Sequence, residues 1–433
     1  MQVAVAFVAS SYNKYSICSL AGAVDSTPAV ANTPLYFLSD RHTEELTGKL
    51  LDLLAKYERI FVCFSFATTN IARVCKLLGS LKKTIGSSRA VFIAGGPHAT
   101  GDWQGTLAMG FDIAAIGEAE ESFPELIGAL SSGLDWQKIK GIAYIKDGTI
   151  VKTGKRDPVD LNRFAPFSLK YGKLSPIEIS RGCPHACRFC QTSFIFGLKM
   201  RHRSIEEIIK YIELSKKNGT RDFRFISPDA LAYGSKDGKT ANLGAVENLL
   251  KEAAKITGKG HLFFGSFPSE VRPEAVSEDA LRLITCYTAT KQIVMGAQTG
   301  SQRMLDLLHR GHTVGDIYKA VKLTLNAGFE VSVDFIFGLP GETEADRMLS
   351  LKMIDKLTAL GAKIHSHTFM PLPGTPLADS QAGTVDAELA IYLSRLANKG
   401  LQFGQWKKQQ DLANEAYRFR QNINTKLGNF TIR

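Results

Sequence analysis

The chain has 433 residues and a formal net charge of +11, with 44% hydrophobic and 22% charged residues. This balance is typical of globular proteins and excludes disordered, collagen-like and disulfide-scaffold classes. The length predicts two or three domains. No apolar run reaches the roughly 18 residues that a membrane-spanning helix needs, and the first ten residues lack the basic leader of a signal peptide. We therefore expect a cytoplasmic protein with no membrane partner.

Residues 1–135 alternate between short apolar runs and amphipathic stretches. Short buried strands with helices between them predict a doubly wound, Rossmann-like parallel sheet. Such a sheet binds its ligand outside the carboxyl ends of the strands. The pattern predicts strands at 3–8, 35–38, 60–66, 90–94 and 112–116, and helices at 43–57 and 70–81.

Residues 136–174 form a polar connector, which we interpret as a linker with a hairpin turn at Asp147-Gly148. A second alternation follows over residues 175–382, and six βα units with right-handed crossovers predict a partial (β/α)6 barrel. Residues 383–433 are expected to be helical. The barrel strands are predicted at 177–180, 223–227, 261–266, 292–297, 330–337 and 364–370, and its helices at 204–218, 242–257, 278–287, 302–308, 314–327 and 344–360.

Three of the seven cysteines follow the first barrel strand directly. Cys183, Cys187 and Cys190 have the spacing C-x3-C-x2-C. Three thiolates can hold three irons of a 4Fe–4S cluster and leave the fourth iron open to another ligand. The alternative is a structural zinc site with His185 as the fourth ligand, although a ligand between two of the cysteines would be strained. The other four cysteines are expected to be buried thiols.

The segment SRGCPHACRFCQ resembles the signature of the radical S-adenosylmethionine (radical SAM) superfamily. Three later segments, GAQTGSQRMLDLLHRGHT, VDFIFGLPGET and FMPLPGTPL, are similar to consecutive strand motifs of its methylthiotransferase-like and cobalamin-dependent groups. The resemblance covers about residues 176–377. It implies a 4Fe–4S cluster whose open iron chelates S-adenosylmethionine, and a one-electron cleavage that yields a 5′-deoxyadenosyl radical.

The resemblance also implies which residues contact S-adenosylmethionine. Phe189 matches the aromatic residue that usually precedes the last cysteine, and polar residues end the second, third and fourth strands. Arg272 could pair with the cofactor carboxylate as a bidentate donor, or lie on the surface. The candidates are Phe189, Ser227, Ser269, Glu270, Arg272, Gln298 and Thr299. Ser301 also ends the fourth strand, and Ser227 and Asp229, at the end of the second, are the weaker candidates for the cofactor or the substrate.

Residues 1–135 resemble the cobalamin-binding domain found upstream of many radical SAM barrels. The matching segments are FSFATTN, IAGGPHAT and IGEAEESFPEL, whose glycines allow close approach to a flat ligand. The Asp-x-His-x-x-Gly motif is absent, so the resemblance implies a cobalt without a histidine ligand, or else a vestigial scaffold. The cobalamin candidates are Ser65, Thr68, Thr69, Gly95, Gly96, Pro97, Gly117 and Glu118.

These features favour a cobalamin-dependent radical SAM C-methyltransferase that acts on an unactivated carbon. Residues 1–135 have a net charge of −3 and the remainder +14, which suggests an anionic or acidic partner. We expect a protein or peptide side chain as substrate, with methyl-coenzyme M reductase as one candidate, and a reductase or ferredoxin-type electron donor.

Two alternatives remain open. Methylthiolation, cyclisation or epimerisation could occur beside a vestigial cobalamin domain, or the chain could be a non-catalytic corrinoid- or nucleic-acid-binding protein, although nucleic acid is disfavoured. His365, His367, Trp406 and Tyr417 could line the substrate side of the site, with core packing as the alternative for each.

Overall fold

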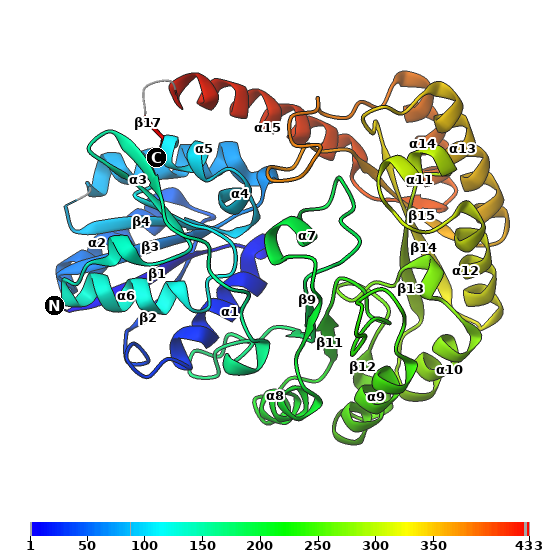
Figure 1. Ribbon diagram of the computed structural model, residues 1–433, viewed down its shortest axis with the longest axis horizontal. Coiled ribbons are helices and arrows are strands. Elements are labelled where there is room, and N and C mark those ends of the chain that lie inside the picture. The colour runs from blue at the N-terminus through cyan, green and yellow to red at the C-terminus, as the bar shows by residue number, and fades with distance from the viewer. Residues whose placement is uncertain (1, 87, 428–430, 433) are drawn as a thin grey trace. The chain divides into compact units, whose positions relative to one another are not determined.

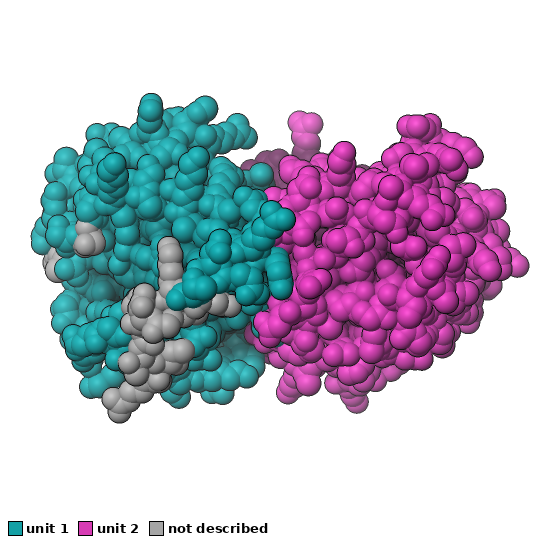
Figure 2. Space-filling model, turned by 90° about the horizontal axis from the view of Figure 1, so that it is seen from above, with its two compact units in different colours: residues 1–175, 372–374, 415–433 teal, residues 176–371, 375–414 magenta. Residues whose placement is uncertain are grey.

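The computed structural model describes residues 2–86, 88–427 and 431–432. The chain divides into two compact units, coloured separately in Figure 2. Unit 1 comprises residues 1–175, 372–374 and 415–433, and unit 2 comprises residues 176–371 and 375–414. No helix among the described residues is long and apolar enough to cross a membrane.

Unit 1 is built on a mixed sheet with the strand order β17-β7-β6-β5-β4-β3-β1-β2. Its β2-β1-β3-β4-β5 part is wholly parallel and confirms the predicted doubly wound, Rossmann-like fold. In this strand order the direction of winding changes between β1 and β3, where such sheets bind their ligands. The strands are β1 (Val3–Ala9), β2 (Leu35–Ser39), β3 (Arg59–Ser65), β4 (Ala90–Gly95), β5 (Ile113–Ala115), β6 (Ile142–Lys146), β7 (Thr149–Lys152) and β17 (Thr431–Ile432).

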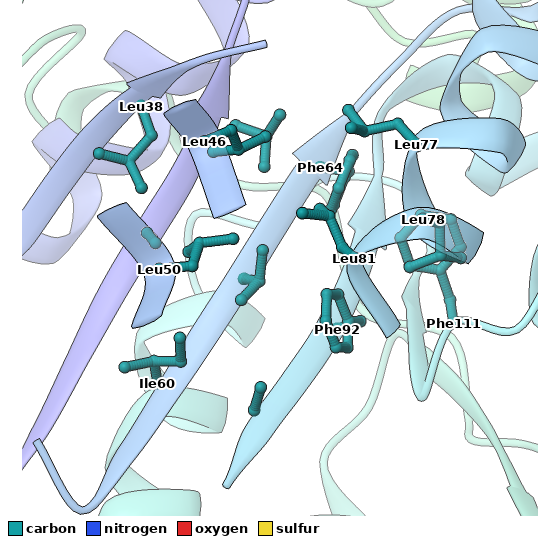
Figure 3. Packing of buried hydrophobic residues seen from close by; sticks show 14 of the residues in the cluster. Leu38, Leu46, Leu50, Ile60, Phe64, Leu77, Leu78, Leu81, Phe92 and Phe111 are labelled. Carbon is teal, nitrogen blue, oxygen red and sulfur yellow. The ribbon is translucent and has the colours of Figure 1, made fainter. Parts of the chain in front are cut away.

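Helices cover both faces of this sheet because its strands are apolar on both faces. Alternate residues of β3 illustrate this: Ile60, Val62 and Phe64 pack with α2 (Thr43–Lys56) and α3 (Ile71–Ile85), as Figure 3 shows in part. Phe61 and Cys63 face the opposite side, with α1 (Lys14–Asp25) and α6 (Ser122–Ser132). The remaining helices of this part are α4 (Gly96–Gly101) and α5 (Trp103–Ala108).

The segment interpreted as a linker instead extends the sheet of unit 1. β6 and β7 form an antiparallel hairpin, and β6 pairs with β5. Asp147 and Gly148 have φ angles of 48° and 72°, as a two-residue hairpin turn requires. The segment resembles a linker in the sequence because both strands are short, at five and four residues, and end in exposed lysines beside the turn or the following loop. The expected C-terminal helical region is likewise divided, since 383–414 belong to unit 2 and 415–433 to unit 1.

Unit 2 is a curved, parallel strand array that confirms the predicted partial barrel. Strands β12, β11 and β8 form one sheet, and β13, β14, β15 and β16 form another. Backbone hydrogen bonds join the two, because Val294 N donates to Gly265 O and Val271 N donates to Val294 O. The strands are β8 (Ile177–Glu178), β11 (Phe223–Ile226), β12 (Leu262–Phe263), β13 (Gln292–Gln298), β14 (Glu330–Phe337), β15 (Lys363–Thr368) and β16 (Gln402–Phe403), with a small antiparallel pair of β9 (Ser180–Arg181) and β10 (Arg201–His202).

Figure 1 shows the long helices of unit 2 along the outer side of these strands. Their ends follow from local sequence. For example, Thr343 and Asp346 form a capping box at the start of α13 (Glu344–Ala359). The helices are α7 (Gln191–Phe196), α8 (Ile205–Lys217), α9 (Leu243–Thr257), α10 (Glu278–Tyr287), α11 (Gln302–Leu307), α12 (Val314–Asn326), α13, α14 (Ala387–Asn398) and α15 (Trp406–Leu427), the last continuing into unit 1.

Candidate active site

The cysteine loop of unit 2 begins at a position that only glycine fits. Gly182 has a φ of +89°, and a Cβ there would lie 2.4 Å from the carbonyl oxygen of Lys199. The loop is then held by its own backbone: Cys183 N donates to Gly197 O at 3.1 Å, and Cys190 N donates to Cys187 O at 3.0 Å. The three cysteines are therefore placed by the main chain, whatever their sulfurs bind.

The three thiols fit a group larger than a single metal ion. All seven cysteines lie in the described part of the chain, and none is in a disulfide. Burial raises the pKa of the Cys183 thiol, and the neighbouring Cys187 and Cys190 raise it further. Within residues 2–86, 88–427 and 431–432 these sulfurs do not form a ligand set for a single ion. Three thiolates on one short loop suit a 4Fe–4S cluster that leaves one iron open.

The structure does not support zinc with His185 as the fourth ligand. His185 joins no set of three His, Cys, Asp or Glu ligands among the residues that the structure describes. Burial, together with the positive charge of Arg272, lowers the pKa of its ring to about 4.

Two buried arginines contact the sulfur of Cys187. Arg310 Nη1 lies 3.4 Å from Cys187 Sγ, and Arg272 Nη1 lies 4.0 Å from it. Arg310 Nη2 also donates to Gly296 O at 2.7 Å, and Arg272 Nε donates to Glu274 Oε1 at 2.5 Å. Arg272 is therefore not a surface residue. Sequence reasoning did not identify Arg310, because its segment HRGHT has no pattern that points towards a cysteine 123 positions away.

Three of the expected S-adenosylmethionine contacts have hydroxyls that are already engaged within the protein. Ser227 Oγ donates to Asp229 O at 2.8 Å, and Ser269 Oγ donates to Ser266 O at 3.2 Å. Thr299 Oγ1 lies 3.1 Å from Ser350 Oγ. These three residues shape the ends of their strands. Ser301, which also follows the fourth strand, caps α11 by accepting a hydrogen bond from Met304 N.

Glu270 and Gln298 are the expected contacts whose side chains remain open to a ligand. Both are half-buried. Gln298 adopts a φ of 75° at an irregularity in the β13–β14 pairing, which is uncommon for a non-glycine residue. Burial, together with the negative charge of Asp334, raises the pKa of the Glu270 carboxyl to about 7. Perturbed carboxyls of this kind are frequent at functional sites.

Phe189 packs into an apolar cluster beside the cysteine loop. This group, called the Phe369 cluster, consists of Met304, Leu308, Leu339, Phe369 and Leu377, and Phe189 and Ile336 pack against it. Phe189 therefore anchors the loop. Two further carboxyls, Asp229 and Glu342, have pKa values raised to about 7 by burial.

In unit 1, the expected cobalamin residues lie at the carboxyl ends of β3, β4 and β5. Gly96 has a φ of +89°, and a Cβ there would lie 2.8 Å from Phe66 N and from Ser65 Oγ. Gly117 also has a positive φ, but a Cβ there would meet nothing within 4 Å. Gly96 is therefore needed for packing, whereas Gly117 borders open space. Gly95 and Pro97 belong to the same turn into α4.

Several side chains at this edge of the sheet already form hydrogen bonds within unit 1. Ser65 Oγ lies 2.8 Å from Ser16 Oγ, and Thr68 Oγ1 lies 3.1 Å from His98 Nδ1. Glu118 Oε2 accepts from Val159 N at 3.3 Å, and Thr69 Oγ1 accepts from Asn70 Nδ2 at 3.0 Å. Sequence reasoning missed Asn13 and Ser16, which follow β1 at the point where the winding changes. Asn13 Nδ2 donates to Val8 O and to Ser65 O.

His98 and the N-terminal cysteines have structural roles. His98 is fully buried, and burial lowers the pKa of its ring to about 4. Its ring also stacks on Phe66. Cys63 and the helix that carries Cys75 lie on opposite faces of the sheet, since Cys63 packs on the α1 and α6 side and α3 on the other. These two sulfurs therefore do not converge on a common group. The expectation of four buried thiols is correct for Cys18 and Cys63 and wrong for the other two: Cys75 is half-buried, and Cys286 is exposed because it lies on the side of α10 away from the buried residues of that helix.

Comparison with known proteins identifies the barrel. Residues 177–354 match the family model of the Radical SAM superfamily, a stretch that runs from β8 into α13. The chain therefore contains a radical SAM domain, and the cofactors of that superfamily are a 4Fe–4S cluster and S-adenosylmethionine. Cys183, Cys187 and Cys190 are the residues of this chain that fit the cluster.

The curated relatives resemble only part of this chain. A putative methylthiotransferase of Methanocaldococcus jannaschii is 28% identical over 291 residues, which is 66% of this chain and 61% of the relative. A tRNA-2-methylthio-N(6)-dimethylallyladenosine synthase of Stenotrophomonas maltophilia is 29% identical over 220 residues, 49% of this chain and 44% of the relative. An uncharacterised protein of Methanopyrus kandleri is 25% identical over 68% of this chain and 64% of its own length. The chain thus spans less than two thirds of each relative.

Solved structures share the fold of both units. The radical S-adenosylmethionine methyltransferase TsrM from Kitasatospora setae, with cobalamin and a [4Fe-4S] cluster bound, matches 87% of this chain and 74% of its own, with a TM-score of 0.66 and 16% identity. The cobalamin-dependent S-adenosylmethionine radical enzyme OxsB matches 82% of this chain and 52% of its own, with a TM-score of 0.64 and 15% identity. At this identity the likeness shows the fold, a doubly wound sheet together with a radical SAM barrel.

Proposed function

We propose that the chain is a cobalamin-dependent radical SAM methyltransferase that acts on an unactivated carbon. The observation that carries this proposal is the combination of folds. The parallel β2-β1-β3-β4-β5 sheet of unit 1 precedes the radical SAM domain, and TsrM and OxsB, whose structures contain cobalamin, have the same combination.

Each part of the chain has a defined task in this proposal. The bound cluster and S-adenosylmethionine would supply a radical that takes hydrogen from carbon, and cobalamin would supply the methyl group. Cys183, Cys187 and Cys190 hold the cluster. Arg272 and Arg310 place two positive charges beside Cys187. The Phe369 cluster keeps water from the base of the cysteine loop.

The proposed contacts differ in whether their side-chain polar groups already have a partner within the protein. For S-adenosylmethionine we assign Glu270 and Gln298 as direct contacts, with Phe189, Ser227, Ser269, Arg272 and Thr299 shaping the site around them. For cobalamin we assign the loops of Ser65, Thr68, Thr69, Gly95, Gly96, Pro97, Gly117 and Glu118. The open space at Gly117 suits a flat ligand, and the buried ring of His98 leaves the cobalt without a histidine from that loop.

The proposed substrate is a carbon of a protein or peptide side chain, for which methyl-coenzyme M reductase is one candidate. The net charge of residues 136–433 is +14, which suits an acidic partner. The reaction needs single electrons, so a reductase or ferredoxin-type donor is the expected second partner.

Methylthiolation is the second candidate function, because two of the relatives carry that activity in their names. It is the less favoured of the two. A second cluster in unit 1 would need convergent cysteines, and Cys63 faces the side of the sheet opposite to the helix that carries Cys75.

The test is anaerobic reconstitution of the full chain with iron, sulfide and hydroxocobalamin, followed by desalting. We expect four irons and about one cobalamin per chain. After an added low-potential reductant has converted the cobalamin to cob(I)alamin, we expect transfer of label from methyl-labelled S-adenosylmethionine to the cobalt. Four irons without retained cobalamin would remove the methyltransferase proposal. Eight irons would favour methylthiolation.

A matched pair of variants checks the cobalamin site. Gly117 and Gly133 both have positive φ angles and open space at the Cβ position. Gly117 follows β5 at the carboxyl edge of the sheet, whereas Gly133 ends α6. Gly117→Phe is expected to abolish cobalamin retention, and Gly133→Phe to leave it unchanged. Equal retention by both variants would contradict the assignment of this edge.

A further inference from the structure

Two histidines and a carboxylate lie on one face of two neighbouring barrel strands. Asp334 on β14 pairs in register with His365 on β15, and His367 follows two residues later on the same face. Ile336 shares this face of β14 and packs against the Phe369 cluster, as does Phe189 of the cysteine loop. The three side chains therefore point to the same inner side of the barrel as the cysteine loop.

The three side chains bring one ligand atom each to a common point. Asp334 Oδ1 lies 3.0 Å from His365 Nδ1 and 3.8 Å from His367 Nε2. His365 Nδ1 and His367 Nε2 lie 3.1 Å apart. A triangle of this size has a point roughly 2 Å from each corner, which is the length of a bond from zinc to nitrogen or oxygen. Two imidazoles and one carboxylate form a ligand set that zinc and ferrous iron use in other proteins.

No placement of protons on the two imidazoles gives His365 Nδ1 a hydrogen bond to both of its neighbours, His367 Nε2 and the Asp334 carboxylate. Gln409 Oε1 accepts from Thr368 N at 3.0 Å, so its amide nitrogen faces His367 Nδ1 at 3.1 Å and donates to it. Neutral His367 then carries its proton on Nε2. If His365 Nδ1 carries a proton, that proton meets the N–H group of His367. If Nδ1 is unprotonated, its lone pair meets the negatively charged carboxylate of Asp334. A cation bound by the three lone pairs would satisfy both contacts of His365.

The ligand atoms are ordered and still accessible. The ring of His365 stacks on Phe403 with centroids 4.5 Å apart and planes 6° from parallel. The side chains of His365, His367 and Asp334 are 30%, 27% and 11% exposed. A cation can therefore reach ligands that are already in place.

We propose that Asp334, His365 and His367 bind one divalent first-row transition cation on the inner side of the radical SAM barrel. Its remaining coordination positions would be open to an oxygen or nitrogen group of the substrate. This site is separate from the cysteine loop and contains no thiolate. Its existence does not depend on cobalamin binding or on methyl transfer.

Gln409 limits how tightly this site binds. A metal on His367 Nε2 moves the ring proton to Nδ1, which then faces the donating amide of Gln409. Metal-bound histidines usually donate that proton to a carboxylate or carbonyl oxygen, and the loss of such a partner lowers metal affinity about 10–100-fold. The site is therefore one from which the cation exchanges. Gln409→Glu would supply the missing acceptor and is expected to tighten binding about 10-fold.

The test uses the full chain with its iron–sulfur cluster reconstituted, dialysed against a series of zinc concentrations. The wild type is expected to take up about one zinc per chain beyond its iron. Asp334→Asn should weaken zinc binding about 100-fold or more. Asparagine has nearly the same shape as aspartate, but its neutral amide replaces the anionic carboxylate ligand. His261→Gln is the control, because His261 makes the same 3.0 Å contact to a carboxylate, Asp222, at an exposed position without a second histidine.

The iron content of each variant shows whether the chain is folded. A variant that binds no zinc but keeps its full iron content has therefore lost only the proposed zinc site. Cobalt replaces zinc in a parallel experiment on cluster-free chain with Cys183, Cys187 and Cys190 changed to alanine. A cobalt spectrum without thiolate charge transfer supports the proposal. Equal zinc uptake by the wild type and Asp334→Asn overturns it, and so does a Gln409→Glu variant that binds no more tightly than the wild type.

Discussion

Arg310 connects the cysteine loop to the inside of the barrel, with Nη1 3.4 Å from the sulfur of Cys187 and Nη2 donating to Gly296 O at 2.7 Å. Gly296 pairs in register with Asp334, which pairs with His365. One guanidinium thus joins the loop proposed to hold the cluster to the strands that carry the polar residues of the barrel. Electron transfer to the cluster should respond to this residue.

We predict that Arg310→Met lowers the reduction potential of the cluster. A positive charge beside a sulfur ligand favours the reduced, more negative state. Loss of about 1.4 kcal/mol of this stabilisation corresponds to about 60 mV for one electron. Redox titration followed by electron paramagnetic resonance measures the shift. Arg310→Lys keeps the positive charge and should lower the potential less. Arg303→Met, which removes the exposed arginine paired with Asp346, should leave the potential unchanged. An unchanged potential in Arg310→Met would rule out this role.

Cys187→Ala is expected to abolish stable iron binding, because two remaining thiolates cannot hold a four-iron cluster with one open iron. Cys286→Ala is the matched control, since Cys286 is an exposed thiol on α10. Iron and sulfide analysis after anaerobic reconstitution distinguishes the two. Full iron and sulfide in Cys187→Ala would mean that the cysteine loop is not the cluster site.

Gly182→Ala should destabilise unit 2 and lower its iron content. The backbone conformation costs about 1–3 kcal/mol for a residue with a side chain, and the added Cβ would collide with Lys199 O. Gly219 provides the comparison: its φ is +87°, but its Cβ would meet nothing within 4 Å. Gly219→Ala should therefore lose stability only through backbone strain and keep its iron. Thermal unfolding and iron analysis of both variants measure the difference.

Glu342→Gln should stabilise the protein at pH 8 and have little effect at pH 5. Burial raises the pKa of the Glu342 carboxyl to about 7 in the folded state. Stability is therefore lost as pH rises from about 4.5, where the unfolded chain ionises, to about 7, and the loss is complete above that. The neutral amide avoids a loss of up to about 3 kcal/mol. Melting temperatures at the two pH values test this, with Glu344→Gln, at an exposed position in the first turn of α13, as control.

The regular elements were predictable because their patterns are local. The structure places β14 at Glu330–Phe337 and α10 at Glu278–Tyr287, the ranges that periodicity predicts. Periodicity did not reveal β16, since a strand of two residues carries no pattern. The hairpin of β6 and β7 was recognised by its turn, but only the pairing of β6 with β5 shows that it belongs to the sheet.

In the candidate site, too, the local features were predictable from the sequence and the long-range contacts were not. The spacing of Cys183, Cys187 and Cys190 is local, so the sequence predicts the cluster loop. Arg310 reaches that loop through the fold, and no spacing indicates it. His365 and His367 were expected to be packed in the core or to face the substrate, and their common contact with Asp334 depends on the register of β14 and β15. Long-range contacts of this kind arise from strand pairing, which periodicity does not encode.

The alternation of β14 has a consequence for how this barrel can change. Ser332, Asp334 and Ile336 line one face, whereas Val333, Phe335 and Phe337 form the other. Point substitutions on the first face can alter the chemistry and leave the second face intact. A single inserted or deleted residue would exchange the two faces, placing the carboxylate among apolar helices and a phenylalanine beside His365. Descendants of this sequence can therefore acquire new substrates one side chain at a time, while the length of the strand is held constant by selection.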